Sequence, residues 1–419
     1  MKFGTIADGK GNELELSNAT FTTLLHDSVP EVRKSAFHQY YAQYESHANT
    51  LAATLSGSNE RDAYAAKVRC HPSAVEAALF ADNVPLAVYD QLIAAVRAHL
   101  PIVHRYYELR RRLLGLDEIH HYDCYVPLVP ELEQKHTWAE AIQEITASLQ
   151  PLGTEYCDQL EAGLRGRWCD RYPNVGKQSG ADSSGTYDSD PYILMNFQED
   201  VIEHVFTLAH EAGHSMHTRL SADAQPFQYA GYTIFVAEVA STFNEQLLTR
   251  HLLSKAHSPK QRAAIISREI DAIRGTIIRQ TMFAEFERMS HASVESGEPL
   301  TLEKIRTIYR ELLTAYFGSG FAIDEALELE SLRIPHFYRA FYVYKYATGL
   351  SASIALSKRV TEGGPKELAA YLQFLRGGCS KWPLDLLRDA GVDLETPEPV
   401  GLALTRFGEL VEELESLLG

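Results

Sequence analysis

The sequence has few cysteines and no closely spaced cysteine pair. Its 419 residues include only five, at Cys70, Cys124, Cys157, Cys169 and Cys379. A disulfide framework of the kind found in small secreted domains is therefore not expected. An odd number of scattered cysteines is typical of reduced thiols, so we predict a protein of a reducing compartment, the cytoplasm.

The sequence also lacks a long hydrophobic run and an excess of basic residues. No stretch is apolar over the length of a membrane span, and the first residues lack the apolar run of a signal peptide. Lys and Arg together number 39 against 56 Asp and Glu, which gives a formal net charge of −17. We therefore expect neither nucleic acid nor a membrane as a partner. The sequence does not predict an oligomeric state.

Apolar residues recur at helical spacing along most of the chain. Clear examples are residues 86–114, 259–291, 302–317, 365–375 and 402–418. The segments Ser28-Val29-Pro30-Glu31 and Thr137-Trp138-Ala139-Glu140 resemble capping boxes, and the first should open a helix that runs to about Gly57. We predict a mainly α fold.

One helical segment, residues 205–217, contains the motif His-Glu-x-x-His. His210 and His214 are four residues apart, so they project from one face of a helix and can share one zinc ion. Glu211 follows the first histidine and can act as a general base toward a water molecule on the metal. The alternative is a core helix that carries three histidines by chance, which would leave a buried Glu211 without a partner.

A catalytic zinc site needs a third protein ligand, and the sequence offers two candidates. His217 is one turn beyond His214, but three ligands in a row on a straight helix do not easily converge on one point. We therefore interpret His217 as a packing or outer-shell residue. Glu238 lies in the apolar segment 231–241, where a carboxylate needs a cation or strong donors. Zinc is the simplest partner, and an ion pair with an arginine is the alternative.

Two further features flank the predicted metal ligands. Glu245 is seven residues beyond Glu238 on the same helix face, so it could orient a ligand histidine. Before the motif, a Gly/Ser-rich turn ends at Gly185 and residues 191–197 resemble a short strand. This strand could pair with an extended peptide, with Gly185 and Tyr192 as substrate contacts, or could be a structural hairpin that covers the helix.

Residues 334–346 form an aromatic cluster that we expect to be helical. Tyr338, Tyr342 and Tyr346 would then share one face, with Tyr344 on the next. Peptide hydrolysis builds negative charge on the carbonyl oxygen, and tyrosine or histidine can donate a hydrogen bond to it. The alternative is an aromatic core helix, although several buried tyrosine hydroxyls would then need partners.

Taken together, these segments resemble the oligoendopeptidase F family of thimet-type zinc oligopeptidases. The resemblance covers nearly the whole chain and is carried by residues 49–57, 109–116, 122–128, 191–197, 210–217, 230–245, 279–286 and 336–349. It implies one zinc ion per chain, held by His210, His214 and Glu238, with Glu211 as the base. It further implies that His336 and Tyr344 contact the substrate carbonyl, and that Tyr338 and Tyr342 bind substrate.

The resemblance also implies an architecture. We expect a single large helical body of the zincin type over residues 1–419, with a small β-hairpin or sheet beside the motif helix. Residues 1–175 should form a wall of a deep channel, and residues 176–419 the zinc-binding part. Full-length relatives carry a further N-terminal helical lobe, so we expect a form without it and a more open channel. Asp182 stands where an aromatic is usual, and Ala212 replaces a bulkier apolar residue.

The sequence thus predicts a zinc endopeptidase that cleaves short unfolded oligopeptides. A zinc exopeptidase of the carboxypeptidase type is an alternative among enzymes, although no local feature for binding a free terminus stands out. The alternative from another class is a helical peptide-binding protein that has lost turnover.

Overall fold

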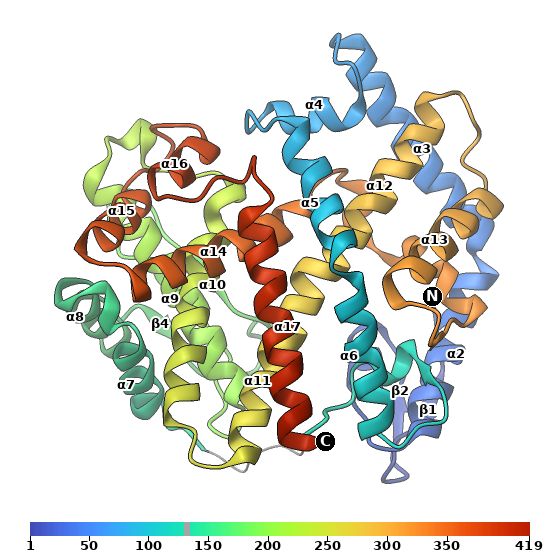
Figure 1. Ribbon diagram of the computed structural model, residues 1–419, viewed down its shortest axis with the longest axis horizontal. Coiled ribbons are helices and arrows are strands. Elements are labelled where there is room, and N and C mark those ends of the chain that lie inside the picture. The colour runs from blue at the N-terminus through green and yellow to red at the C-terminus, as the bar shows by residue number, and fades with distance from the viewer. Residues whose placement is uncertain (130–134) are drawn as a thin grey trace.

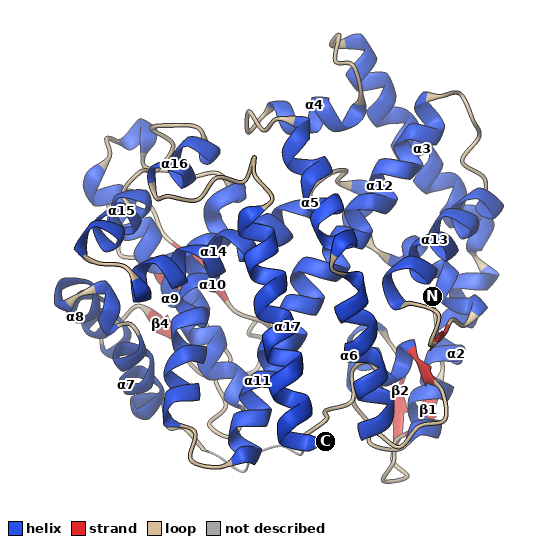
Figure 2. Cartoon of the chain, in the orientation of Figure 1, coloured by secondary structure: helices blue, strands red, loops and turns tan. Residues whose placement is uncertain are grey.

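The computed structural model describes residues 1–129 and 135–419, and α-helices dominate this part of the chain (Figures 1 and 2). Strands occur only as short pairs or triplets. They are β1 (Thr5–Ala7) with β2 (Glu13–Glu15), β3 (Ile119–His120) with β7 (Phe321–Ala322), and the sheet of β4 (Cys169–Asp170), β5 (Asp182–Ser184) and β6 (Tyr192–Leu194). The predicted mainly α fold is confirmed.

The helices form two halves that lie side by side in Figure 1. One half contains α1 (Asn18–Leu25), α2 (Pro30–Ser46), α3 (Ala48–Val68), α4 (Ala74–Phe80), α5 (Leu86–Ala98), α6 (Leu100–Leu113), α12 (Arg279–Glu295) and α13 (Leu302–Phe317). The other contains α7 (Trp138–Ser148), α8 (Thr154–Arg165), α9 (Ile202–Ala224), α10 (Ile234–Lys255), α14 (Tyr344–Glu362), α15 (Pro365–Leu375) and α16 (Pro383–Asp389). The last helix, α17 (Glu398–Leu418), packs on α11 (Pro259–Ile273), α14, α5 and α6, so it joins both halves.

The two halves do not correspond to residues 1–175 and 176–419. Helices α7 and α8, from the first range, pack on α9 and α10. Helices α12 and α13, from the second range, pack on α3, α5 and α6. The two ranges therefore interleave in space, and the chain crosses between the halves more than once.

Local sequence features explain where several helices begin and end. Thr137 caps α7 with the predicted capping box, in which its hydroxyl accepts from the Glu140 backbone and the Glu140 carboxylate accepts from the Thr137 N–H. The box predicted at Ser28 does not form; Val29 occupies the cap position, with Pro30 in the first turn. The helix predicted to reach Gly57 is also wrong in detail, because it is divided at His47 into α2 and α3.

The sheet beside α9 differs from the predicted hairpin strand. Strand β6 lies in the centre, parallel to β4 and antiparallel to β5, so neither of its edges is free. The two edge strands are β4 and β5, and the residues of β5 pair with Tyr192, Ile193 and Leu194 of β6. A peptide that adds to this sheet on the α9 side would therefore pair with β5.

One pair of helices has the length and hydropathy of a membrane span only when its two members are taken together. No single helix within residues 1–129 and 135–419 combines the length and apolarity of a span, and only α5 and α6, bent by 48° at their junction, meet the criteria together. Most apolar residues of this pair are buried in the core.

Candidate metal centre

The His-Glu-x-x-His motif lies in the middle of α9, which is held close to α10 by small residues. Gly213 is the closest point: a Cβ atom there would lie 2.6 Å from the Ala240 carbonyl oxygen and 2.6 Å from the Ser241 Cα. The Asn244 side chain of α10 also donates to the Ala209 carbonyl, 3.1 Å away. Because a larger residue at position 213 would separate the helices, this glycine fixes how near α10 comes to the motif.

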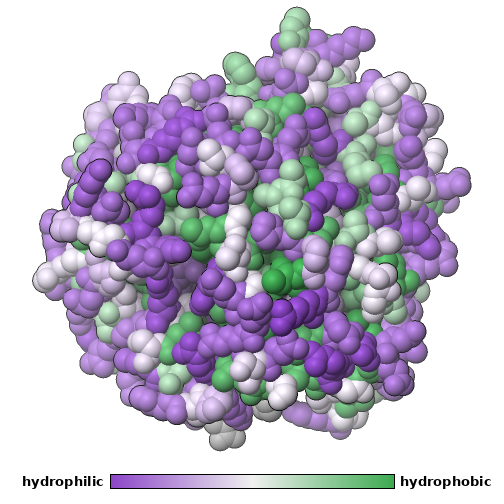
Figure 3. Space-filling model, in the orientation of Figure 1, coloured by the Kyte–Doolittle hydropathy of each residue, from purple (hydrophilic) through white to green (hydrophobic). Residues whose placement is uncertain are grey.

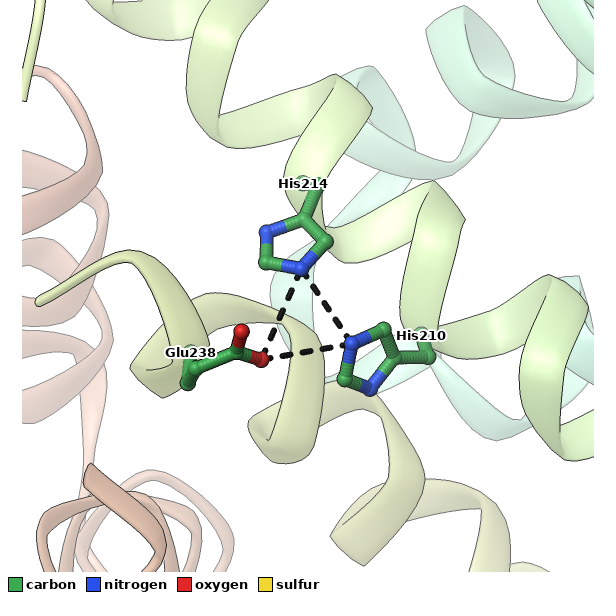
Figure 4. A group of neighbouring side chains, drawn as sticks. All are labelled: His210, His214 and Glu238. Atoms are coloured by element: carbon green, nitrogen blue, oxygen red, sulfur yellow. Dashed lines mark hydrogen bonds and ion pairs between the residues drawn. The ribbon is translucent and has the colours of Figure 1, made fainter. Parts of the chain in front are cut away.

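This close packing brings together the three predicted metal ligands (Figure 4). The Nε2 atoms of His210 and His214 are 3.2 Å apart. Glu238 Oε2 lies 3.3 Å from the His210 Nε2 and 3.6 Å from the His214 Nε2. The three side chains are partly exposed, at 26%, 18% and 28% for His210, His214 and Glu238, so the triangle opens to solvent on one side.

The triangle has the dimensions of a tetrahedral zinc site. Zinc binds histidine nitrogen and carboxylate oxygen at about 2.0–2.2 Å, which places neighbouring ligand atoms of a tetrahedron about 3.3–3.6 Å apart. The three observed edges, 3.2, 3.3 and 3.6 Å, match this spacing. Among the described residues, this is the one group of three His, Cys, Asp or Glu side chains close enough to share an ion.

The charges around the triangle also favour a cation. Burial alone would lower the pKa of His210, but hydrogen bonds with Glu238 and Glu245 outweigh burial and raise this pKa to about 10. Burial would raise the pKa of Glu238, yet His210 and His214 hold it well below its usual range. Glu238 at Nε2 and Glu245 at Nδ1 thus bracket the His210 ring with negative charge, and a divalent ion on the Nε2 side would neutralise Glu238 while the ring donates its Nδ1 proton to Glu245.

The Nδ1 atom of His210 points away from the triangle and is hydrogen-bonded to Glu245, which pairs with Arg268. His210 Nδ1 lies 2.8 Å from Glu245 Oε1, and the other oxygen of Glu245 accepts from Arg268 Nη2 at 3.0 Å. Arg268 comes from α11 and rests over the Phe206 ring, with its guanidinium carbon 3.3 Å from the ring centre. Glu245 thus fixes the orientation of the ring that points Nε2 at the triangle.

Replacing Glu245 by an uncharged residue tests whether its carboxylate orients the His210 ring for metal binding. We expect Glu245→Gln to weaken metal affinity by roughly 10- to 100-fold, because an amide is a poorer acceptor for the Nδ1 proton and loses the pairing with Arg268. Competition with a chromophoric chelator would measure the affinity. An unchanged affinity would contradict the role of Glu245.

Glu211 lies next to the triangle but is not one of its corners. Its side chain is buried, at 7% exposure. Burial raises the pKa of Glu211; His210 and His214 oppose this, and Asp182 and Glu238 add to it. Strand β5, which carries Asp182, packs on the motif helix α9.

His217 occupies a different environment from the two motif histidines. It is 1% exposed, and its ring stacks on Tyr232 with 3.7 Å between ring centres and 7° between planes. Burial, with a smaller contribution from His214, lowers the pKa of His217 to about 3. The ring is thus neutral and packed in the core between α9 and the segment before α10, outside the triangle.

The turn between β5 and β6 is pinned to α9. A Cβ atom at Gly185 would lie 3.1 Å from the Thr218 Cγ2, so glycine lets this turn approach the helix. Ser183 Oγ lies 2.8 Å from the Ser215 Oγ, one turn after Glu211. Tyr192 is 53% exposed on the central strand β6. The edge strand β5 therefore runs along the motif helix at the height of Glu211.

The aromatic segment 334–346 departs from prediction, because it is not one helix. Residues Pro335–Tyr338 form a 3-10 turn, Phe341 has a positive φ of 57°, and α14 begins only at Tyr344. Tyr338 consequently points away from the other tyrosines, and its hydroxyl lies 2.8 Å from the Thr54 Oγ1 of α3. The predicted common face of Tyr338, Tyr342 and Tyr346 does not exist.

Tyr344, which was predicted to contact the substrate carbonyl, is fully buried. Its ring is 0% exposed and lies between Tyr89, at 5.2 Å, and Phe235, at 6.1 Å. Its hydroxyl has no hydrogen-bond partner among the described residues, and burial raises its pKa far above the usual range. In this structure the side chain packs in the core, and the role of Tyr344 in substrate contact stays a prediction.

Tyr342, Tyr346 and His336 form a cluster of rings at the start of α14. The His336 ring is parallel to Tyr342, with 5.8 Å between centres, and edge-on to Tyr346 at 6.0 Å. Tyr342 and Tyr346 are 5.3 Å apart, edge to face. Burial raises the pKa of Tyr346, the neighbouring Tyr342 adds to this, and the charge of Glu238 makes a smaller contribution.

Sequence reasoning missed several supporting residues. Arg268 is on another helix and no local pattern connects it with Glu245, so the sequence carried no sign of it. Ser241, whose hydroxyl donates to the Glu238 Oε2 at 3.0 Å, could have been found from its position one turn after Glu238. Gly213 could also have been found, because a glycine inside a helix often marks close packing.

Comparisons with known proteins agree with this geometry. Residues 23–405 match the model of Peptidase family M3. Oligopeptidase PepF of Bacillus subtilis is 46% identical over 416 residues, which are 99% of this chain and 62% of PepF. Group B oligopeptidase PepB of Streptococcus agalactiae is 39% identical over 418 residues, which are 100% of this chain and 69% of PepB. The chain thus spans under two thirds of PepF.

The fold is shared with solved structures as well. Oligoendopeptidase-F from Enterococcus faecium superposes with a TM-score of 0.82 at 34% identity, over 100% of this chain and 69% of that one. The matched region contains the motif on α9, the carboxylate on α10 and the aromatic segment before α14. By sequence, by fold and by the arrangement of these residues, the chain belongs to Peptidase family M3.

Proposed function

We propose that this chain is a zinc-dependent endopeptidase that hydrolyses short unfolded oligopeptides. The observation that carries the proposal is the triangle of His210, His214 and Glu238, which has zinc-site dimensions and a buried carboxylate, Glu211, beside it. The relatives' names, oligopeptidase and oligoendopeptidase, support oligopeptides as the substrate class. The acidic net charge of −17 favours neither nucleic acid nor an anionic membrane as a partner.

The proposed chemistry divides between the ion and the protein. A zinc ion held by these three ligands would supply Lewis acidity and would lower the pKa of water, so that water could be deprotonated to a nucleophile at neutral pH. Glu211 accepts the proton of the attacking water and delivers it to the leaving amine nitrogen. Burial suits Glu211 for both steps, because a raised pKa makes it a stronger base and a ready donor once protonated.

The protein also positions the peptide and its developing charge. An extended substrate can add to the edge strand β5, since β6 is paired on both sides. Tyr346, Tyr342 and His336 offer neutral donors for the carbonyl oxygen on the open side of the triangle. Burial and Arg339 lower the pKa of His336, which keeps its ring neutral near pH 7.

Cleavage of a defined peptide mixture tests the proposal. The purified protein should cut internal bonds of short peptides, lose this activity to a chelator and regain it with stoichiometric zinc; mass spectrometry of the products records each cut. Stepwise loss of C-terminal residues would indicate the carboxypeptidase-type alternative. Binding of peptides without any product would indicate a peptide-binding protein and reject an enzyme.

Phenylalanine substitutions test which tyrosine serves the reaction. We expect Tyr346→Phe to lower kcat by roughly 100-fold with little change in KM, because one donor to the oxyanion is lost. Tyr342→Phe should act in the same direction. The matched control is Tyr344→Phe, which removes a hydroxyl that bonds to no described residue. If Tyr344→Phe is the variant that loses activity, the assignment from packing is wrong.

A further inference from the structure

The aromatic donors depend on a loop whose backbone is held in an unusual conformation. Phe341, between the 3-10 turn at 335–338 and α14, has a φ of 57°. This left-handed region is rare for bulky residues other than glycine and persists only where surrounding contacts fix it. The next residue is Tyr342, so the direction of this aromatic ring is set by the turn at Phe341.

A buried carboxyl group on α12 supplies one of these contacts. The Phe341 backbone N–H donates to Glu287 Oε1 at 2.7 Å. Glu287 is 1% exposed, and its other oxygen, Oε2, has no hydrogen-bond partner among the described residues. A glutamate is rarely buried with a single side-chain hydrogen bond. The bond from the Phe341 N–H to Glu287 is therefore expected to have a structural role.

The Phe341 side chain is clamped by the same helix and its neighbours. Its ring centre lies 4.5 Å from that of His291, one turn after Glu287 on α12, and 5.8 Å from that of Tyr89 on α5. His291 in turn lies 3.5 Å from the Asp62 carboxylate of α3. Backbone and side chain of Phe341 are thus both fixed by the half of the molecule opposite α9 and α10.

From these contacts we infer that Glu287 is a positioning residue, which locks the Phe341 turn and thereby aims Tyr342, Tyr346 and His336 at the metal triangle. The inference rests on the proposed peptidase function and adds to it that the orientation of these donors is imposed from α12, on the opposite half. Burial raises the pKa of Glu287 well above its usual value, which favours the neutral acid. Glutamine has the same shape and also offers an acceptor oxygen, so Glu287→Gln should preserve the hydrogen bond with the Phe341 N–H.

Three variants test the inference in the metal-loaded protein. Glu287→Leu removes the acceptor and should lower kcat by roughly 10- to 100-fold, more than it changes KM, with zinc content unchanged. Glu287→Gln should keep kcat within about twofold, because the amide oxygen still accepts from the Phe341 N–H. Should Glu287→Leu fail to fold, Glu287→Asp is the second variant. Its side chain is one methylene group shorter, so the carboxyl group is moved away from the Phe341 N–H while a polar side chain is kept, and kcat should fall in the same direction.

A matched control separates positioning from general stability. Glu285 is two residues away on α12, is 9% exposed and pairs with Arg97 and Tyr316, remote from the loop. Glu285→Leu should lower the melting temperature but leave kcat near the parent value. Equal losses of kcat in Glu285→Leu and Glu287→Leu, or a kcat in Glu287→Leu within about twofold of the parent, would overturn the inference.

Hydrogen exchange provides a readout that does not require catalysis. The Phe341 amide should exchange roughly tenfold faster in Glu287→Leu than in the parent, and at the parent rate in Glu285→Leu and Glu287→Gln. Unchanged protection in Glu287→Leu would overturn the inference even if kcat fell. A parent protein that cleaves no peptide would reject the proposed function, whereas the exchange experiment would still decide whether Glu287 holds the turn.

Discussion

Replacement of Glu211 by glutamine is expected to lower kcat by about three orders of magnitude while the protein keeps its metal and its fold. Glutamine has the same shape and fits the buried site, but it cannot take a proton from water or return one to the leaving amine. Because Glu211 is not a corner of the metal triangle, zinc stoichiometry should stay the same. Steady-state cleavage of a quenched fluorescent peptide would measure the loss.

The control for this experiment is another buried glutamate. Glu269 of α11 is 3% exposed and accepts two hydrogen bonds from Arg406 of α17. Glu269→Gln should retain the parent kcat, even if the melting temperature falls. A Glu211→Gln variant that cleaves peptide at near the parental rate would show that Glu211 is not the base.

Loss of a metal ligand should lower turnover by a similar factor, because the protein would no longer hold zinc. We expect His210→Ala or His214→Ala to abolish stoichiometric zinc, since each removes one of three protein ligands and leaves the others unable to hold the ion tightly. Glu238→Gln should weaken zinc by more than about 100-fold, which exceeds the effect of an outer-shell change. Turnover at limiting zinc should fall in parallel in all three variants.

His217→Ala is the matched control for the ligand variants. This histidine is on the same helix but is stacked on Tyr232 and buried, so its removal should cost stability and leave zinc bound. Elemental analysis of each purified variant would give the stoichiometry. Zinc that is retained in Glu238→Gln and lost in His217→Ala would reverse the ligand assignment.

The sequence predicted the parts of the site that depend on local spacing. Histidines four apart on a helix must share a face, and a carboxylate inside an apolar helix must find a cation, so His210, His214 and Glu238 could be grouped without a structure. The seven-residue interval from Glu238 also indicated Glu245 as the neighbour of a ligand. These inferences use one helix at a time and require no knowledge of how the helices pack.

The errors arose where the chain leaves regular geometry. The common face of Tyr338, Tyr342 and Tyr346 was predicted by assuming a continuous helix. The left-handed backbone of Phe341 interrupts that helix. Because bulky residues rarely adopt this conformation, nothing in the sequence indicated that a phenylalanine would do so. The hairpin strand was found, but its place in the sheet depends on β4, which is more than 20 residues earlier in the chain. Arg268 was missed for the same reason, since it reaches Glu245 only through packing.

The interleaving of the halves has a consequence for attempts to divide this protein. Helix α3 completes its packing only against α12 and α13, which follow it by over 200 residues, and α7 is far from its partners α9 and α10. Expression of residues 1–175 and 176–419 as separate polypeptides would expose apolar faces on both pieces. During synthesis, α3 also stays incompletely covered until α13 leaves the ribosome, and α5 and α6 stay so until α17 does, which makes assistance by a chaperone an advantage for this chain.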